Sequence, residues 1–340
     1  MNPTLIMDIG SSYIKLGSSS NDQVTVIPNC IGKTILRNGS VQNEMVIGRD
    51  VINNKQHLEL QYPVQNGQIT DFDALKTIIK HELELIEKLE SIIISGSVQD
   101  KYQLQVLAFQ CGFKRVCVME QPILALLTHN ITSGLIVDIG AAQTRITPVY
   151  ENQILRGETL QLGGDSITTQ LSNQLRKRGY NLSHLDFEPI QQLKEQHCFF
   201  SEDLAADSLL AKETTFFMQE HIVNKKRVRA NSELFTAPEI FFNPHIAGFE
   251  YLPLQSVIYK VIQQQPIDVK SDLMQNIILT GQSTHLPGLK SKLQTLVQRE
   301  FENGAKTGFR GSIRVKRIYN DVNEGARIMC ANQFGDWAEM

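Results

Sequence analysis

A six-residue pattern ending in Asp-Ile-Gly occurs twice in this 340-residue sequence, and its residues suit phosphate and metal chemistry. The first copy, residues 5–10, contains Asp8, and the second, residues 135–140, contains Asp138. A glycine turn can direct successive backbone N–H groups into one concavity that binds phosphate. An aspartate at the end of a strand can hold a hydrated divalent cation. The repeat therefore predicts two similar tips that grip a polyphosphate between two domains.

Each copy is predicted to form a β-hairpin. An apolar run suited to a buried strand precedes each tip, and an alternating run follows it at residues 13–16 and 144–147. Asp-x-Gly is also a common turn sequence, so a single copy alone would favour a purely structural role. Two copies with matching flanks favour the binding interpretation and two halves built alike.

Strands and helices are expected to alternate along the chain, which is typical of an α/β fold. Residues 91–95 and 116–119 predict short buried strands, and Asp73 is a candidate N-cap for a helix with an apolar stripe. The stripe consists of Leu75, Ile78, Ile79, Leu83 and Ile86.

A strand, a glycine turn and a helix start follow one another near the end of the chain. Residues 276–281 predict the strand and its turn, and Pro287-Gly288 opens a helix with Leu289, Leu293, Leu296 and Val297 on one face. This succession suggests a site for a nucleotide base or phosphate.

Composition excludes several classes of function. With 41% apolar and 20% charged residues the chain is ordinary soluble material, and its net charge of −3 argues against nucleic acid or an anionic membrane as the main partner. No apolar run approaches the roughly 18 residues of a membrane span, and Asp8 interrupts the first apolar stretch before it could act as a signal peptide. We therefore expect the chain inside the cell.

The cysteines and histidines show no metal-binding pattern. The five cysteines lack CxxC spacing, which predicts reduced thiols. The eight histidines lack HxxxH and HExxH motifs, so a protein-ligated transition metal has little support.

These pieces, in this order, resemble the actin-related branch of the actin, Hsp70 and sugar-kinase superfamily. Residues 7–17 look like the first actin phosphate hairpin, and residues 137–140 with 148–151 look like the second. Two segments outside the hairpins favour actin over its cousins: residues 61–67 resemble the segment that carries the modified histidine, and residues 237–244 resemble a subdomain-four signature.

The resemblance implies an α/β, actin-like ATPase fold with two similar lobes around a nucleotide cleft. It assigns residues 1–128 and 318–340 to the first lobe, with a small subdomain two at 29–62. Residues 129–317 would form the second lobe, with subdomain four at 163–250.

The resemblance also implies that the cofactor is ATP or ADP with Mg²⁺. Asp8 and Asp138 would hold Mg²⁺ through its water shell, and Lys15 would neutralise phosphate charge. Gln121 falls on the position of the water-orienting glutamine of actins, which makes Gln121 and Asp138 the candidate catalytic residues. The residues expected to bind nucleotide are Asp8, Gly10, Ser11, Ser12, Lys15, Asp138, Gly140, Ala141, Gly164, Asp165, Lys194, Glu195, Gly281, Gln282 and Ser283.

Two of these assignments have a structural alternative. Gln121 could simply end a strand before a helix that begins with proline, and Lys194 with Glu195 could be an exposed helical pair. The resemblance to the water-orienting glutamine and to the adenine-contacting helix of actins favours function for both.

Three departures from the actin pattern lie at the expected site. Ala141 stands where conventional actin has an additional aspartate, Ser12 replaces a phosphate-loop glycine, and Gln282 replaces a glycine of the adenosine loop. We therefore expect binding of nucleotide with slow or absent hydrolysis, which makes the protein at most a weak ATPase.

Other departures concern assembly. The segment from Gly32 to Gly48 is shorter than the DNase-binding loop region of actin, and the sequence stops at Met340 without actin's longer tail. The basic run 224–229 is interpreted as the solvated edge of a hairpin in preference to a nuclear-import signal.

The leading hypothesis is a divergent actin-related protein that serves as an ATP- or ADP-binding architectural subunit of a cytoskeletal or chromatin-associated complex. Its expected partners are other protein subunits, with actin and other actin-related proteins among the candidates, and neither nucleic acid nor membrane directly. The expected location is the cytoplasm in association with the cytoskeleton, with the nucleus as the alternative. A filament-forming actin-like ATPase is the second hypothesis, and a small-molecule kinase of the same superfamily is the third.

Overall fold

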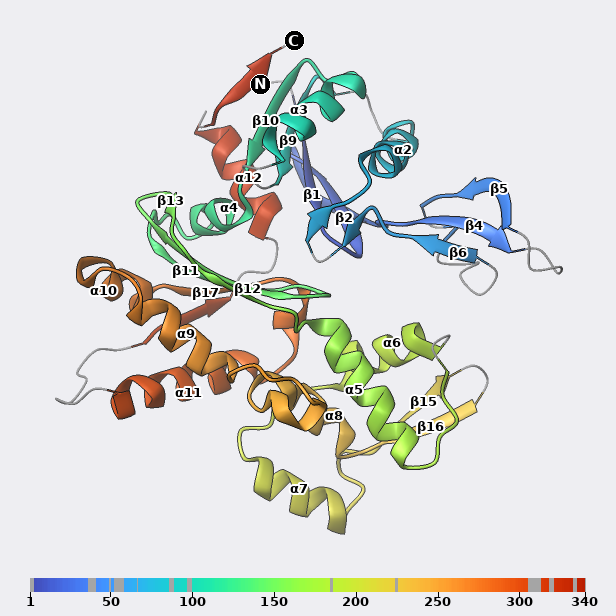
Figure 1. Ribbon diagram of the computed structural model, residues 1–340, viewed down its shortest axis with the longest axis vertical. Coiled ribbons are helices and arrows are strands. Elements are labelled where there is room, and N and C mark those ends of the chain that lie inside the picture. The colour runs from blue at the N-terminus through green and yellow to red at the C-terminus, as the bar shows by residue number, and fades with distance from the viewer. Residues whose placement is uncertain are drawn as a thin grey trace. The chain divides into compact units, whose positions relative to one another are not determined.

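The computed structural model divides into two compact units, Met1–Thr132 with Asn320–Met340 and Ser133–Tyr319. It describes the whole chain except residues 1–2, 36–40, 49, 52–57, 66, 86–88, 97–99, 184–185, 224–225, 305–312, 318–320, 333–334 and 340. Ile86 of the expected apolar stripe, residues 36–40 of the segment 32–48 and residues 224–225 of the basic run therefore lie outside the described residues. Each unit is built on a six-stranded mixed sheet with helices packed against it, which confirms the predicted α/β class (Figure 1).

The sheet of the first unit has the strand order β19-β10-β9-β1-β2-β3. Its centre is a parallel set, β10-β9-β1, and β2 returns antiparallel to β1 as the predicted hairpin. The strands are β1 (Thr4–Ile9), β2 (Tyr13–Ser18), β3 (Asn21–Pro28), β9 (Ser91–Ser95), β10 (Arg115–Met119) and β19 (Trp337–Glu339).

Helices cover both faces of this sheet because its apolar residues alternate in direction (Figure 1). Leu5 and Met7 belong to one buried cluster with residues of α2 and α3, whereas Ile6 belongs to another with residues of α4 and α12. The helices are α2 (Phe72–Leu83), α3 (Lys101–Gln110), α4 (Gln121–Leu127) and α12 (Asp321–Ala331). Two small sheets complete the described part of this unit: β4 (Ile31–Ile35), β5 (Val41–Val46) and β6 (Leu58–Gln61) form one, and β7 (Val64–Gln65) and β8 (Gln68–Ile69) form the other.

The N-cap of α2 corrects the sequence prediction. Asp71, in an extended conformation, accepts a hydrogen bond from the backbone N–H of Ala74 at 2.8 Å, whereas Asp73 lies inside the first turn. The helix therefore begins one residue before Asp73, and the Asp73 carboxylate instead stands near the positive end of the helix dipole. The predicted stripe is otherwise present, since Leu75, Ile78 and Ile79 are buried.

The sheet of the second unit has the order β13-β12-β11-β17-β18, and β14 also pairs with β12. As in the first unit, an antiparallel hairpin (β11 and β12) adjoins parallel strands (β11, β17 and β18). The strands are β11 (Gly134–Ile139), β12 (Thr144–Tyr150), β13 (Gln153–Ile154), β14 (Glu158–Leu160), β17 (Ile277–Thr280) and β18 (Val315–Arg317). The second predicted hairpin is thus confirmed, and the two units repeat one arrangement of strands.

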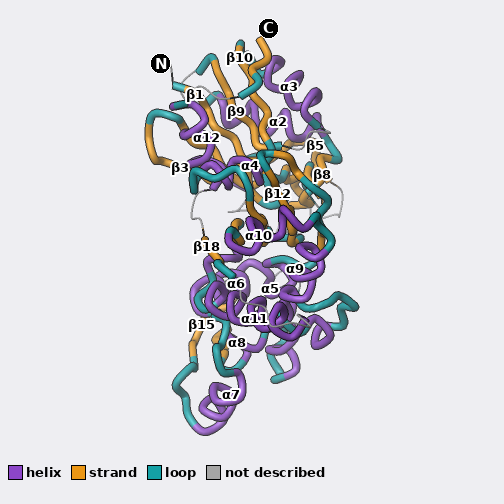
Figure 2. Tube along the Cα trace, turned by 90° about the vertical axis from the view of Figure 1, so that its left-hand side faces the viewer, coloured by secondary structure: helices purple, strands orange, loops and turns teal. Residues whose placement is uncertain are grey.

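The second unit has the larger helical part (Figure 2). Its buried cluster joins one face of the sheet to apolar residues of α5, α6, α9, α10 and α11. The helices are α5 (Gly164–Lys177), α6 (Phe187–His197), α7 (Leu204–Glu213), α8 (Glu233–Thr236), α9 (Leu254–Gln263), α10 (Ile267–Gln275) and α11 (Leu289–Gly304), with the 3-10 helices η3 (Pro238–Phe241), η4 (Pro244–Ala247) and η5 (Gln282–His285). A separate hairpin, β15 (Gln219–Val223) and β16 (Lys226–Ala230), contains the described part of the basic run.

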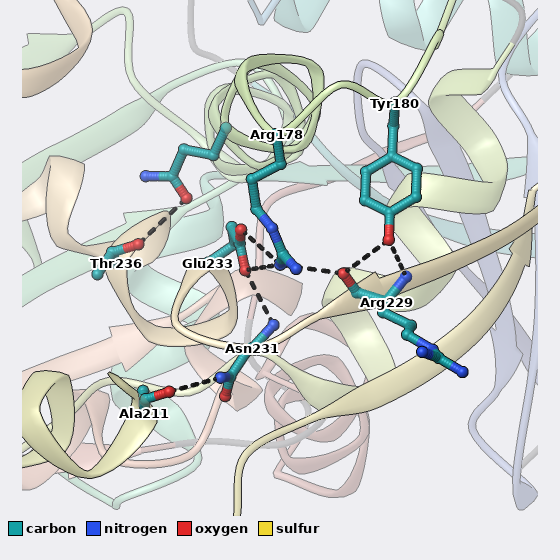
Figure 3. A network of polar contacts seen from close by, with 8 residues as sticks. Arg178, Tyr180, Ala211, Arg229, Asn231, Glu233 and Thr236 are labelled. Carbon is teal, nitrogen blue, oxygen red and sulfur yellow. Dashed lines mark hydrogen bonds and ion pairs between the residues drawn. The ribbon is translucent and has the colours of Figure 1, made fainter. Parts of the chain in front are cut away.

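A polar network fixes the carboxyl-terminal end of α5 (Figure 3). The guanidinium of Arg178 donates to both carboxylate oxygens of buried Glu233, at 2.8 and 3.0 Å, and to the carbonyl of Arg229 at 3.1 Å. The hydroxyl of Tyr180 accepts from the Arg229 N–H at 3.0 Å, and Asn231 donates through its side chain to the carbonyl of Ala211 at 2.8 Å. Helix α5 is therefore tied to β16, α8 and α7 at one end, while its other end lies at the second tip.

Candidate functional site

The two hairpin tips have the same turn. The N–H of Gly10 donates to the carbonyl of Tyr13 at 3.0 Å, and the N–H of Gly140 donates to the carbonyl of Gln143 at 2.9 Å. Each turn encloses two small residues, Ser11-Ser12 in the first unit and Ala141-Ala142 in the second. The predicted tips therefore exist in both units with equivalent backbone hydrogen bonds.

In the first unit, the carboxylate of Asp8 is held from two sides. The Ser95 hydroxyl donates to its Oδ1 atom at 2.9 Å, and Lys15 Nζ lies 3.6 Å from its Oδ2 atom. Asp8 pairs with Lys15 across the hairpin and with Ser95 across the parallel strands, so all three side chains lie on one face of the sheet. A largely buried carboxylate beside a half-buried lysine can bind a hydrated cation and an anion side by side.

The first tip is anchored by residues distant in sequence. The side-chain amide of Asn29 donates to the carbonyl of Gly10 at 2.7 Å, and its backbone N–H donates to the carbonyl of Ser12 at 2.9 Å. The N–H of Gly67 donates to the Ser11 hydroxyl at 3.2 Å. These contacts occupy the carbonyls of Gly10 and Ser12 and the hydroxyl of Ser11, which fixes the shape of the turn.

Gln121 is the first residue of α4 and follows the end of β10. The register aligns Asp8 with Ser95 and Ser95 with Met119, so the parallel strands end together and Gln121 follows the same edge of the sheet. Pro122 also lies in the first turn of α4, as the structural alternative expected. The water-orienting role of Gln121 stays a prediction.

In the second unit, Asp138 has the same kind of hydroxyl partner. Thr280 lies beside Asp138 on the parallel strand β17, and its hydroxyl donates to Asp138 Oδ1 at 3.2 Å. Gly281 follows with φ +88°, and a Cβ atom there would lie 2.4 Å from the Ile139 carbonyl oxygen and 2.7 Å from Asp138 Oδ1. Only glycine fits this turn without displacing the second tip.

Three elements meet on the carbonyl group of Gly140. It accepts the N–H of Gly164 at 2.9 Å from the start of α5 and the hydroxyl of Ser283 at 3.3 Å from η5, while the N–H of Asp165 donates to the Ala141 carbonyl at 2.9 Å. The structure thus brings together five residues that the sequence placed in three separate segments.

Lys194 of α6 joins the same cluster. Its ammonium group donates to the carbonyl of Gly164 at 3.1 Å, and burial lowers its pKa, an effect that Glu195 and Asp165 oppose. Burial likewise raises the pKa of Asp165, and Lys194 offsets part of that shift. Lys194 is therefore no surface residue, which removes the alternative of an exposed helical pair for this lysine.

Three further members of the expected set, Glu195, Gln282 and Ser12, are fully or partly exposed. Glu195 is exposed and accepts a hydrogen bond from Gln191 at 2.8 Å, as in the surface alternative. Gln282 is also exposed, at the start of η5, whereas Ser12 is half-buried in the first tip. Ser12 and Gln282, which stand where actins have glycine, therefore both have side chains with access to solvent.

The sequence interpretation missed Ser95, Thr280 and Asn29. A second short repeat could have revealed the two hydroxyls, because residues 92–96 and 277–281 both read as three apolar residues, a hydroxyl residue and glycine. No local signal marks Asn29, whose function depends on a turn that lies far earlier in the chain.

The donor set suits Mg²⁺ held mainly by water and phosphate. Among the described residues, no group of three or more His, Cys, Asp or Glu side chains could hold a metal ion. Mg²⁺ commonly uses one or two carboxylates together with waters and substrate phosphates, so the single aspartate of either tip suits such an ion without a protein-made cage.

The cysteines are free thiols, and Cys30, Cys117 and Cys198 are buried. Burial raises the pKa of Cys198 to about 12, so this thiol stays protonated near neutral pH. Within the described part of the chain, no helix is both long and apolar enough to span a bilayer.

Comparison with known proteins agrees with the repeated strands and the two tips. The family model described as Actin matches residues 1–322. Proteins named Actin-related protein 2 are similar to this chain: that of Caenorhabditis briggsae is 31% identical over 85% of this chain and 78% of its own length, and that of Schizosaccharomyces pombe is 29% identical over 87% and 80%. That of Drosophila melanogaster is 27% identical over 92% of this chain and 86% of its own length. The chain belongs to the actin family, as a divergent actin-related protein.

Proposed function

We propose that the protein binds Mg-ATP or Mg-ADP, turns it over slowly or not at all, and serves as an architectural subunit of a multiprotein complex. One observation carries the nucleotide assignment: the second tip, the start of α5 and η5 all meet on the Gly140 carbonyl. Lys194 donates to the carbonyl of Gly164 beside them. The N–H groups of Gly164 and Asp165 hold the second tip, so the N–H groups of the tip itself, with the buried Lys194 nearby, would serve a polyphosphate with an attached base.

The residues of each unit would have distinct tasks. Lys15 would donate to phosphate oxygens, and the tip residues Ser11-Ser12 and Ala141-Ala142 would offer backbone N–H groups. Bound Mg²⁺ would neutralise phosphate charge, with Asp8 and Asp138 orienting its water shell. Lys194, Gly281 and Ser283 would shape the part of the site that receives the adenosine.

Slow turnover follows from the composition of the second tip. Attack on a phosphate needs a water molecule that is oriented and polarised, and Gln121 with Asp138 would supply that orientation. Ala141 offers no carboxylate at the position where conventional actins have one, so the attacking water would have fewer preorganised partners.

Calorimetry on folded, nucleotide-free protein tests the binding. We expect ATP and ADP to bind in the presence of Mg²⁺, and Lys15→Gln to weaken both by about tenfold to a hundredfold, as expected for a lost hydrogen bond to a charged group. Lys80→Gln, at an exposed position on α2, makes the same charge change and should leave affinity unaltered. Absence of binding to the parent protein would refute the nucleotide assignment.

The architectural role is supported by the named relatives, which are actin-related proteins. The partners would be other protein subunits, with actin or actin-related proteins among them, in the cytoplasm and in association with the cytoskeleton. Affinity purification should recover a fixed set of other chains. Sedimentation and electron microscopy with Mg-ATP should show no long filaments of the protein alone, and regular helical filaments would instead favour the cytoskeletal ATPase.

A further inference from the structure

We propose that Arg145 is a phosphate-binding residue and the second unit's counterpart of Lys15. The inference rests on the proposed nucleotide binding and assigns a second cation to the same chemistry. Neither the six-residue repeat nor the expected set of site residues contains Arg145, but Arg145 stands 130 residues after Lys15, as Asp138 does after Asp8.

The register of the two hairpins supports the assignment. In the first hairpin Asp8 is opposite Lys15, and in the second Asp138 is opposite Arg145. The neighbouring parallel strand adds Ser95 beside Asp8 and Thr280 beside Asp138, and each hydroxyl donates to the Oδ1 atom of its aspartate. A carboxylate, a hydroxyl and a cation thus occupy equivalent positions in both units.

Burial along β11 and β12 indicates the face on which Arg145 lies. Ile146 is buried in the main cluster with Val137 and Ile139, whereas Asp138 and Arg145 are only partly buried. Because opposite residues of an antiparallel pair project to the same side, the Arg145 side chain shares a face with Asp138 and stands away from the helical core. On the other side of β12, Arg145 is opposite Thr159 of β14, which is exposed.

The chemistry of arginine suits this position. A guanidinium group is always charged and can donate two parallel hydrogen bonds to a phosphate, which a lysine cannot do. Together, Asp138 and Arg145 have no net charge, and Ala141 adds none. The second tip would therefore offer the guanidinium group of Arg145 to phosphate, with Asp138 as the one carboxylate opposite it.

Binding measurements with ATP, ADP and adenosine test the proposal. Arg145→Gln should weaken ATP and ADP by about tenfold to a hundredfold and leave adenosine within about twofold of the parent protein. Arg145→Lys keeps the charge and should lose less affinity than Arg145→Gln. Arg299→Gln is the matched control, because Arg299 is exposed on α11, about 15 Å along the helix from its start, and the same substitution there should change nothing.

Each outcome decides one question. If the parent protein binds none of the three ligands, the proposed function fails. If the parent binds ATP and Arg145→Gln binds it equally well, or loses adenosine to the same extent, the role of Arg145 is refuted while the proposed function stands. Arg145→Thr is the second neutral variant because threonine suits a strand. If circular dichroism shows that neither neutral variant folds, Arg145 is structural and the proposal is likewise overturned.

Discussion

Replacing Gly281 by alanine should weaken the second unit at its candidate site. Gly281 has φ +88° and ψ +151°, a region that is essentially limited to glycine, and a residue with a side chain there costs about 1–3 kcal/mol of backbone strain. The new Cβ would also lie 2.4 Å from the Ile139 carbonyl oxygen. Relieving such an overlap in a packed region typically costs about 1–3 kcal/mol more. We therefore expect a loss of about 2–6 kcal/mol in the free energy of unfolding.

Gly179→Ala provides the matched control for this prediction. Gly179 has φ +97°, but a Cβ atom there would meet nothing within 4 Å, so only the strain of about 1–2 kcal/mol remains. Urea unfolding followed by far-ultraviolet circular dichroism measures both variants, and fluorescence of Trp337 follows the first unit separately because it is the one tryptophan of the chain. If Gly281→Ala is no less stable than Gly179→Ala, the argument from close contact is wrong.

Two further predictions concern turnover and pH. Ala141→Asp should accelerate phosphate release from ATP by about a hundredfold to a thousandfold if Gln121 still orients the water. The control variant Ala142→Asp should not change the rate. If Ala141→Asp binds nucleotide but releases phosphate at the unchanged rate, the account of Ala141 is contradicted. Because burial lowers the pKa of Lys194, the folded state favours the neutral amine, and the stabilising contribution of this group grows as pH rises and is lost as pH falls through the lowered pKa. The unfolding free energy of the parent protein relative to Lys194→Met should therefore rise as pH is raised toward the ordinary lysine pKa of about 10.4, and a constant difference in urea midpoints would show that Lys194 is not held in this way.

The local parts of this structure could be predicted from sequence, whereas the contacts between segments could not. The two hairpins follow from short patterns around Asp8 and Asp138, and both form as expected. The N-cap of α2 was misplaced because Asp71 and Asp73 are equally suitable by residue type, and only the backbone conformation of Asp71 decides between them. The anchoring by Asn29 required a contact across 19 residues that no local pattern encodes.

The same limit applies to the second unit. Gly164 and Ser283 entered the expected set through resemblance, but their meeting point on the carbonyl of Gly140 is a property of the folded backbone, as is the hydrogen bond from Lys194 to the carbonyl of Gly164. A backbone carbonyl has no residue identity, so sequence patterns contain no sign of it. Arg145 differs in this respect, since its equivalence to Lys15 is already contained in the 130-residue spacing that relates Asp138 to Asp8.

The different anchors of the two tips have a consequence for how this protein can evolve. The first tip depends on the amide side chain of Asn29, which one nucleotide change can remove, whereas the second is held by N–H groups of Gly164 and Asp165 at a place where a Cβ on Gly164 would lie 2.4 Å from the Ser283 hydroxyl oxygen. A substitution of Asn29 would thus act through a lost side-chain hydrogen bond, whereas a substitution of Gly164 or Gly281 would act through steric overlap at or beside the second tip. In descendants of this protein, the first half of the repeat can therefore change as long as an amide side chain remains at position 29, and the second half as long as its close-packed glycines remain.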